Sequence, residues 1–168
     1  MTKVRAGAIV LATGAIEQPI AFHNNDLPGV LMCSGAQRLL HRHSIAVGRR
    51  VVIVTTNRAG YEAARDLLDA AVNVTHIVDL ATDKSGAELL EGRSVAIVSG
   101  RHPLEAEAGA DGCVAAFRVG EQRIDCDAVL MSGGWAAATQ LLLQAGGKVT
   151  FDDVTQMHLP SHLPDGFF

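Results

Sequence analysis

The sequence predicts an α/β protein, a three-layer domain that combines a parallel sheet with a three-stranded β-meander. The first observation is a strand–helix–strand unit over residues 51–79, because two strands joined through a helix lie parallel. The second is a run of short alternating segments over 94–126, bounded by Gly-containing turns, which is typical of a meander. The third is the apolar strand 128–131, which ends in Ser132-Gly133-Gly134.

Within the first unit, the β-branched run Val51–Val54 predicts a buried strand, and Gly60 to Ala71 carries apolar residues at helical spacing. Val74–Val78 predicts the second strand. The remaining expected elements are a buried parallel strand over 8–14 (AIVLATG), a crossing linker over 15–30, a helix over 34–46 with Ser34 as its N-cap, a short helix over 85–91, a helix over 136–145, and a short strand over 149–151 before an irregular tail.

Composition excludes several classes of function. The 168 residues are 48% hydrophobic with 17 glycines, as in folded α/β proteins, while aromatics make up 4% and the net charge is −4. With no basic run and few aromatics, we expect neither nucleic acid nor a membrane as a partner. Three cysteines, Cys33, Cys113 and Cys126, show no C-x-x-C spacing and predict reduced thiols in the cytoplasm.

Residues 51–64, VVIVTTNRAGYEAA, follow the frame of a dinucleotide-binding turn, which is strand, G-x-G-x-x-G, helix. Thr55, Asn57 and Gly60 stand in the three glycine positions. The first glycine allows the tight turn, the second lets the backbone approach a pyrophosphate, and the third lets the helix pack on the strand. The sequence therefore predicts a Rossmann-like fold with a degenerate dinucleotide site. Backbone amides at the helix start, aided by Arg58, are the alternative route to binding NAD.

Three further residues are candidate cofactor contacts. Asp79 ends the second strand about 20 residues after the turn, where an acid binds the adenosine ribose in this fold. A carboxylate that accepts hydrogen bonds from the following segment is an equally good interpretation. Gly14 and Gly133 end the strands 8–14 and 128–134, and each is either a cofactor contact or a simple tight turn.

No residue is predicted to be catalytic, and no metal site is predicted, because the chain has no G-x-S-x-G, H-E-x-x-H or P-loop motif. His41 and His43 lie on different faces of their predicted helix. His158 and His162 lie in a Pro-bounded tail. Cys33 precedes a helix start, where the helix dipole favours a lowered thiol pKa.

Two copies of one pattern, AIVLATG at 8–14 and AVLMSGG at 128–134, bracket the predicted domain. This arrangement resembles the inserted second nucleotide domain of the pyridine-nucleotide–disulfide oxidoreductase fold, a flavoprotein fold with two dinucleotide domains. The segments GAIEQPIAFHNNDLPGV, AQRLLHR, VGRRVVIVTTNRAGYEAARDLL and MSGGWAAATQLLLQAGGKVTFDD resemble the α subunit of heterotetrameric sarcosine oxidase.

The resemblance implies a larger α subunit, roughly six times this length. It implies β, γ and δ subunits as partners, and a complex that uses FAD, FMN and NAD to oxidise sarcosine while tetrahydrofolate captures the one-carbon unit. The chain is then expected to be a fragment that binds no cofactor itself. It is divided into residues 1–30 from a preceding nucleotide domain, a degenerate NAD(P)-binding-like domain over 31–134, and a return segment over 135–168. A working NAD domain remains an alternative, as does an interaction domain of a related opine oxidase or hydrogen cyanide synthase subunit.

Overall fold

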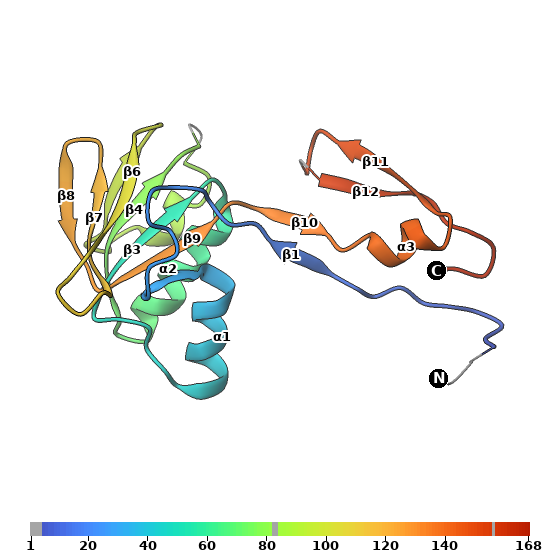
Figure 1. Cartoon of the computed structure of the whole chain (residues 1–168), viewed down its shortest axis with the longest axis horizontal. Helices are drawn as coiled ribbons and strands as arrows, with labels where there is room; N and C mark the ends of the chain where they lie inside the picture. The colour runs from blue at the N-terminus through green and yellow to red at the C-terminus, as the bar shows by residue number, and fades with distance from the viewer. Residues whose placement is uncertain (1–4, 82–83, 156) are drawn as a thin grey trace. The chain divides into compact units, whose positions relative to one another are not determined.

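The structure is a computed structural model that describes residues 5–81, 84–155 and 157–168 (Figure 1). The chain forms two compact units. The first unit joins the segment that ends at Ile16 to the segment Trp135–Phe168, and the second unit is the continuous segment Glu17–Gly134. The predicted domains 1–30, 31–134 and 135–168 stay predictions.

A five-stranded sheet with the strand order β2-β9-β3-β4-β5 forms the middle of the second unit. Every pairing in it is parallel. Its strands are β2 (Val30–Met32), β3 (Arg50–Thr55), β4 (Asn73–Asp79), β5 (Ala96–Ser99) and β9 (Ala128–Ser132). The predicted α/β class with a parallel sheet is confirmed, and the predicted strands at 51–54, 74–78 and 128–131 lie within β3, β4 and β9.

Each face of this sheet has its own core, because successive side chains of a strand point to opposite faces. Val51 and Ile53 of β3 pack in one core with the helices α1 (Cys33–His43) and α2 (Arg58–Asp69). Val52 and Val54 pack in the other core with the meander. Burial on both faces explains why β3 reads as a continuous apolar run.

The meander consists of β6 (Leu104–Ala108), β7 (Val114–Val119) and β8 (Gln122–Asp125), which pair antiparallel in that order. Phe117 of β7 is fully buried and meets Phe22 edge to face, with ring centroids 5.2 Å apart. The helices, the parallel sheet and the meander are therefore three layers, as the sequence predicts.

The start of α1 differs from the prediction. The N-cap is Met32, which makes no side-chain capping bond, so Ser34 is not the N-cap. Instead the Ser34 N–H donates to the Glu17 carboxylate at 2.9 Å. Glu17 is a buried residue, and a negative charge at a helix N-terminus is favourable. The cap comes from a residue 17 positions earlier, so it leaves no local pattern in the sequence.

The linker predicted over 15–30 also differs, since it includes β1 (Ala15–Glu17) and leads into β2. β1 pairs with β10 (Trp135–Ala137), and β2 pairs with β9. Both partners lie far along the chain, and strands of three residues are too short to show a period. The short helix predicted at 85–91 is the 3₁₀ turn η1 (Ala87–Leu90).

In the first unit, the buried strand predicted over 8–14 is wrong. This segment is extended and exposed, with Val10 75% accessible, and its pairing is an isolated bridge between Ile9 and Phe167. An apolar run forms a buried parallel strand only where strands flank it on both sides. The described residues of this unit provide no such flanking strands.

Two more predictions for the first unit, the helix over 136–145 and the irregular tail, differ from the structure. The helix predicted over 136–145 is β10 followed by α3 (Gln140–Gln144), and the tail forms a second strand. That strand, β12 (Met157–His162), pairs antiparallel with β11 (Lys148–Asp152). Thr139 and Gly146 bracket α3, which leaves room for only one and a half turns of helix.

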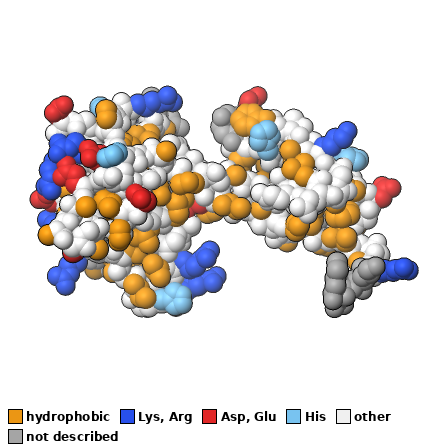
Figure 2. All heavy atoms as spheres, in the orientation of Figure 1, with side chains coloured by type: hydrophobic (Ala, Val, Ile, Leu, Met, Phe, Trp, Pro, Cys, Tyr) orange, Lys and Arg blue, Asp and Glu red, His pale blue; other side chains and the backbone are white. Residues whose placement is uncertain are grey.

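Hydrophobic side chains lie at the surface of the first unit (Figure 2). Its large apolar side chains that are at least 40% accessible are Ile9, Val10, Ile16, Trp135, Leu141, Leu143, Phe151, Val154, Leu163 and Phe168. In the second unit Ile45 alone reaches this accessibility among the described residues.

Within the described part of the chain, no helix is long and apolar enough to cross a membrane. The helix α2 has 12 residues, whereas a span takes about 20.

Gly60→Ala tests the contact that holds α2 on β3. A β-carbon on Gly60 would lie 2.4 Å from the β-carbon of Thr55, which real structures do not tolerate. Because both residues are buried, we expect a loss of about 1–3 kcal/mol in the free energy of unfolding, measured by urea denaturation.

Gly35→Ala is the matched control, since Gly35 lies in α1 with open space around the same position. It is expected to leave stability unchanged or to raise it by up to about 1 kcal/mol through helix propensity. Equal effects of the two substitutions would contradict the packing role of Gly60.

Candidate functional site

The candidate site is the turn that connects β3 to α2, residues 55–58, called here the β3–α2 turn. The Thr55 side chain closes it internally, since its hydroxyl accepts from the Asn57 N–H at 3.1 Å and donates to the Asn57 carbonyl at 2.8 Å. Thr55 is fully buried and fills the space that Gly60 leaves open. The Thr55 hydroxyl therefore stabilises the tight turn at the position where the fingerprint has its first glycine.

Asn57 is the N-cap of α2. Its side-chain oxygen accepts from the backbone N–H of Ala59 at 2.9 Å, and its backbone is extended. Asparagine is among the best N-cap residues because it satisfies one of the free amides at a helix start. The sequence holds this signal, an Asn directly before a helical pattern, although the glycine fingerprint points to a different role for the position.

Asn57 also ties the β3–α2 turn to the end of β9. Its side-chain nitrogen donates to the Ser132 carbonyl at 3.1 Å, and the Thr56 N–H donates to the same carbonyl at 3.1 Å. β3 and β9 are neighbouring parallel strands in which Thr55 is paired with Ser132. Ser132 is thus part of the candidate site; the sequence pattern AVLMSGG at 128–134 contains it but does not predict this contact.

Asp79 lies at the end of β4, fully buried, with both carboxylate oxygens engaged. The Tyr61 hydroxyl donates to Oδ2 at 2.7 Å, and the Ala81 N–H donates to Oδ1 at 2.9 Å. Tyr61 comes from α2, so the carboxylate links that helix to the strand end. This is the geometry of the second interpretation, a carboxylate that receives hydrogen bonds from its own chain.

Arg58, the predicted extra positive charge beside the turn, pairs with acidic side chains. It bonds Glu88, and its Nε lies 3.3 Å from the Glu62 carboxylate. The hydrogen bond that Arg58 donates to Glu88 raises the pKa of Arg58, with a smaller contribution from Glu62. The charge of Arg58 is therefore already balanced within the chain.

Gly14 and Gly133, the two glycines predicted to end strands, lie in different units. In the second unit, Gly133 donates its N–H to the Gln18 carbonyl at 2.8 Å, and a β-carbon on it would lie 2.8 Å from that same oxygen. Position 133 thus requires glycine because the backbone carbonyl of Gln18 lies too close for a β-carbon. Gly14, in the first unit, has φ +68° and accepts a hydrogen bond from the Ala138 N–H at 2.9 Å.

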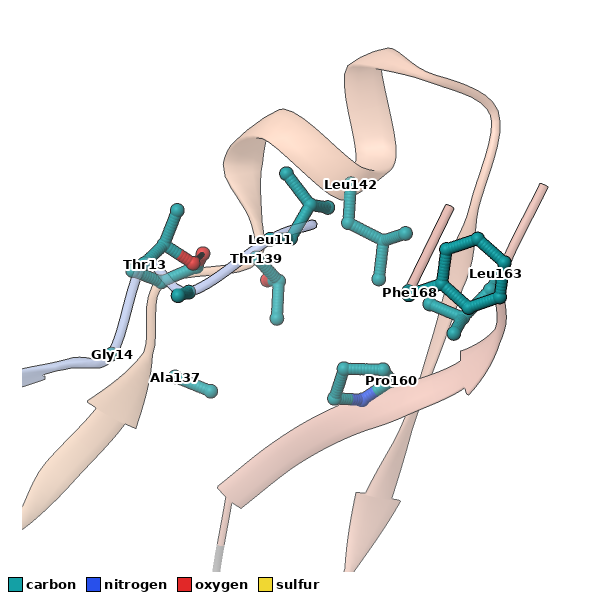
Figure 3. A pocket seen from close by; sticks show the side chains of 11 residues that line it. Leu11, Thr13, Gly14, Ala137, Thr139, Leu142, Pro160, Leu163 and Phe168 are labelled. Carbon is teal, nitrogen blue, oxygen red and sulfur yellow. Dashed lines mark hydrogen bonds between the residues drawn. The ribbon is translucent and has the colours of Figure 1, made fainter. Parts of the chain in front are cut away.

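Gly14 also lines a pocket of about 320 Å³ within the first unit (Figure 3). Its larger apolar side chains are those of Leu11, Leu142, Pro160, Leu163 and Phe168. Thr13 is also in the wall, but its hydroxyl donates to the Ala138 carbonyl at 2.7 Å. The pocket is mainly apolar.

A wider cleft of about 570 Å³ opens beside the β3–α2 turn, at the carboxyl edge of the parallel sheet. Thr56 and Leu80 follow β3 and β4, and Arg101 and His102 follow β5. Ligands of open α/β sheets bind at this edge. The lining of the cleft includes the apolar side chain of Phe22 and the cationic side chain of Arg101.

The prediction that the helix dipole lowers the pKa of the Cys33 thiol is wrong. Cys33 begins α1, but burial raises the pKa of its thiol, and the nearby Glu17 raises it further, so the helix dipole does not activate it. Burial likewise raises the pKa of Cys126 to about 12, with Asp127 adding to the effect. All three cysteines are free, and Cys113 is exposed. In the described residues, no group of three His, Cys, Asp or Glu side chains is arranged to hold a metal ion.

No family model matches the chain. The sarcosine oxidase alpha subunit of Corynebacterium sp. (strain P-1) is 31% identical over 168 residues, covering 94% of this chain and 17% of that protein. The corresponding protein of Rhizobium meliloti (strain 1021) is 35% identical over 152 residues, covering 87% of this chain and 15% of that protein. The resemblance to sarcosine oxidase alpha subunits is thereby confirmed, and the chain spans about a sixth of the length of these relatives.

An opine oxidase subunit of Agrobacterium tumefaciens (strain Ach5) is also similar, with 26% identity over 193 residues. That match covers 97% of this chain and 37% of the relative.

Many solved structures resemble the chain, and two of them serve as examples. The L-proline dehydrogenase from P. horikoshii has a TM-score of 0.70 and 21% identity, over 96% of this chain and 28% of its own. A FAD-dependent pyridine nucleotide-disulphide oxidoreductase from Desulfovibrio vulgaris has a TM-score of 0.69 and 22% identity. The match covers 92% of this chain and 45% of that protein. At these identities the likeness shows the fold, and it confirms the predicted Rossmann-like class.

Thiol labelling tests the burial of the cysteines. Because the thiolate is the reacting form, iodoacetamide at pH 8 is expected to modify Cys113 readily and to leave Cys33 and Cys126 unmodified until the protein unfolds. Mass spectrometry of peptides follows each site, and Cys113→Ser should abolish the rapid phase. Modification of Cys33 in the folded protein at a rate like that of Cys113 would show that its thiol is accessible and active.

Proposed function

We propose that the chain is the central segment of the α subunit of a sarcosine-oxidase-type enzyme, in a complex that oxidises sarcosine with removal of its methyl group. The supporting observation is the match to sarcosine oxidase alpha subunits over 94% of the chain. Since the chain spans 17% of that relative, the activity belongs to the larger assembly. No residue of this segment is assigned to catalysis.

Within that subunit, we propose that the segment is a structural module with a degenerate dinucleotide site. One observation carries this proposal: the Asn57 carboxamide, at the position of the second glycine, caps α2 through Ala59 and bonds the Ser132 carbonyl. A dinucleotide phosphate needs the free amides of a helix start and a close approach to backbone. Both requirements conflict with the position of the Asn57 side chain.

The proposed partners are the flanking domains of the same polypeptide and the other subunits of the oxidase. The exposed apolar side chains of the first unit support this proposal, because such surfaces are typically covered by protein. NAD, FAD and FMN are proposed as cofactors of the whole complex, held outside this segment. The three free thiols support a reducing compartment, which we take to be the cytoplasm.

A working NAD domain is the second candidate. The cleft of about 570 Å³ beside the β3–α2 turn favours it, since Arg101 in its lining would attract a phosphate and Leu80 would contact a base. An interaction domain of an opine oxidase or hydrogen cyanide synthase subunit is a variant of the structural role. The similarity to the opine oxidase subunit supports that variant.

Calorimetric titration of NAD, NADH, FAD and FMN into the 168-residue protein, after its visible spectrum is recorded, tests the proposal. We expect a colourless protein and flat titrations, because Asn57 occupies the helix-start amide. A yellow protein, or an isotherm with a dissociation constant near 1 μM (about −8 kcal/mol), would contradict the structural role. Should NAD bind, Asp79→Ala tests the role of Asp79, with circular dichroism to establish that the variant is folded, because this carboxylate also bonds Tyr61. Loss of binding by a folded variant would support the ribose contact and the second candidate.

A further inference from the structure

The helix α1 carries basic side chains and no acidic one: Arg38, His41, Arg42 and His43. His41 lies 3.3 Å from the Asp66 carboxylate of α2. Arg38 and Arg42 are exposed, and their side chains form no ion pair with another described residue. By contrast, every arginine of α2 and of the meander is paired with a carboxylate. The helix α1 thus differs from those elements in having positive charge that the described part of the chain does not balance.

Arg38 and Arg42 lie one turn apart on the helix. Residues four apart share one face of a helix, and two like charges at this spacing repel each other. The negative end of the helix dipole favours a base in the last turn, which explains Arg42. It does not explain Arg38, which lies in the middle of α1. An external negative charge would replace the repulsion between the two guanidinium groups with a joint attraction.

An apolar side chain lies at the end of the same helix. The Ile45 N–H donates to the Leu39 carbonyl at 3.1 Å, so this residue is held against the last turn of α1. Its side chain is 50% accessible. A groove of about 570 Å³ opens at the same helix end, and Leu40, Ala46 and Val72 are among the residues that line it. Arginine beside an exposed apolar side chain is a composition typical of protein–protein interfaces.

The positive charge is concentrated in one part of the chain. Five arginines and no acidic residue lie between Asp26 and Glu62, although the whole chain has a net charge of −4. Basic and histidine side chains gather beside α1 on the face shown in Figure 2. A partner attracted here is therefore acidic. It is protein rather than nucleic acid, because a nucleic acid would be repelled by the acidic remainder of the chain.

We propose that Arg38, Arg42 and Ile45, called here the α1 surface, dock an acidic surface of another subunit of the oxidase complex. The proposal rests on the multi-subunit enzyme proposed above. Carboxylates of that subunit would pair with the two arginines, and an apolar side chain would pack on Ile45. A charged surface with a single apolar residue is typical of contacts between separately folded chains, whereas permanent contacts are more hydrophobic. This distinction separates the α1 surface from the apolar surface of the first unit.

Zero-length cross-linking of the assembled oxidase tests the proposal, with the full-length α subunit numbered as here. Arg38→Lys and Arg42→Lys keep the positive charge and supply a primary amine, which a carbodiimide joins to a carboxylate in direct contact. Arg118→Lys is the matched control, because Arg118 pairs with Glu107 inside the chain. Mass spectrometry of the cross-linked peptides identifies each pair of residues.

We expect position 38 or 42 to be linked to an Asp or Glu of another subunit, and position 118 to be linked to Glu107. An assembled enzyme that shows the control link, but no link from 38 or 42 to another subunit, would overturn the α1 surface and leave the proposed function intact. A link only to a second α subunit, or to another part of the same α subunit, would overturn it too. An α subunit that forms no complex would overturn both proposals.

Charge reversal provides an independent measurement. Arg42→Glu is expected to weaken association with that subunit roughly tenfold at about 50 mM salt, and the loss is expected to shrink at about 500 mM salt, where charges are screened. Lys84→Glu is the matched control, since it makes the same change of charge at an exposed residue of the second unit. Circular dichroism establishes that both variants are folded. Equal losses in the two variants would overturn the proposal, because they would report net charge alone.

Discussion

The close contact between Gly60 and Thr55 is the constraint on which the second unit depends. It sets α2 against β3 at a distance that admits no β-carbon on Gly60. Because α2 then lies flat on the sheet, its apolar residues Tyr61, Ala64 and Leu67 become fully buried.

Several polar groups in and beside the β3–α2 turn are hydrogen-bonded to other residues of the chain. Thr55 holds the backbone of Asn57, Asn57 caps the helix, and the Tyr61 hydroxyl bonds the carboxylate of Asp79. Buried polar groups are stable only when they are hydrogen-bonded. The side chains of Thr55, Asn57 and Tyr61 provide such bonds from within the chain.

Sequence reasoning succeeded where the pattern is local and repeated. The apolar run of β3, the helical spacing of α2 and the alternation in the meander all predicted the elements that form. Sequence reasoning failed where the stabilising partner lies far away along the chain. Glu17 caps α1 across the fold, and the three residues of β2 become a strand only through β9. The run 8–14 has the sequence of a buried strand, but no flanking strands cover it in the described part of the first unit.

The candidate site was predictable in outline and not in detail. The glycine fingerprint placed Thr55, Asn57 and Gly60 in one turn, and Asp79 at the end of the next strand. It gave no indication that the Ser132 carbonyl would receive the Asn57 carboxamide, because that contact joins residues 75 positions apart. The chemical meaning of an asparagine in a glycine position became visible only with the structure.

Hydrogen exchange of the Ala59 backbone amide, followed by NMR, tests most directly whether the turn is closed. Since this N–H is bonded to the Asn57 side chain, the account predicts slow exchange, and no change in its chemical shift when NAD is added. Rapid exchange in the folded protein, or a shift of this amide that saturates with NAD, would show that the helix start is open to a ligand and would contradict the account.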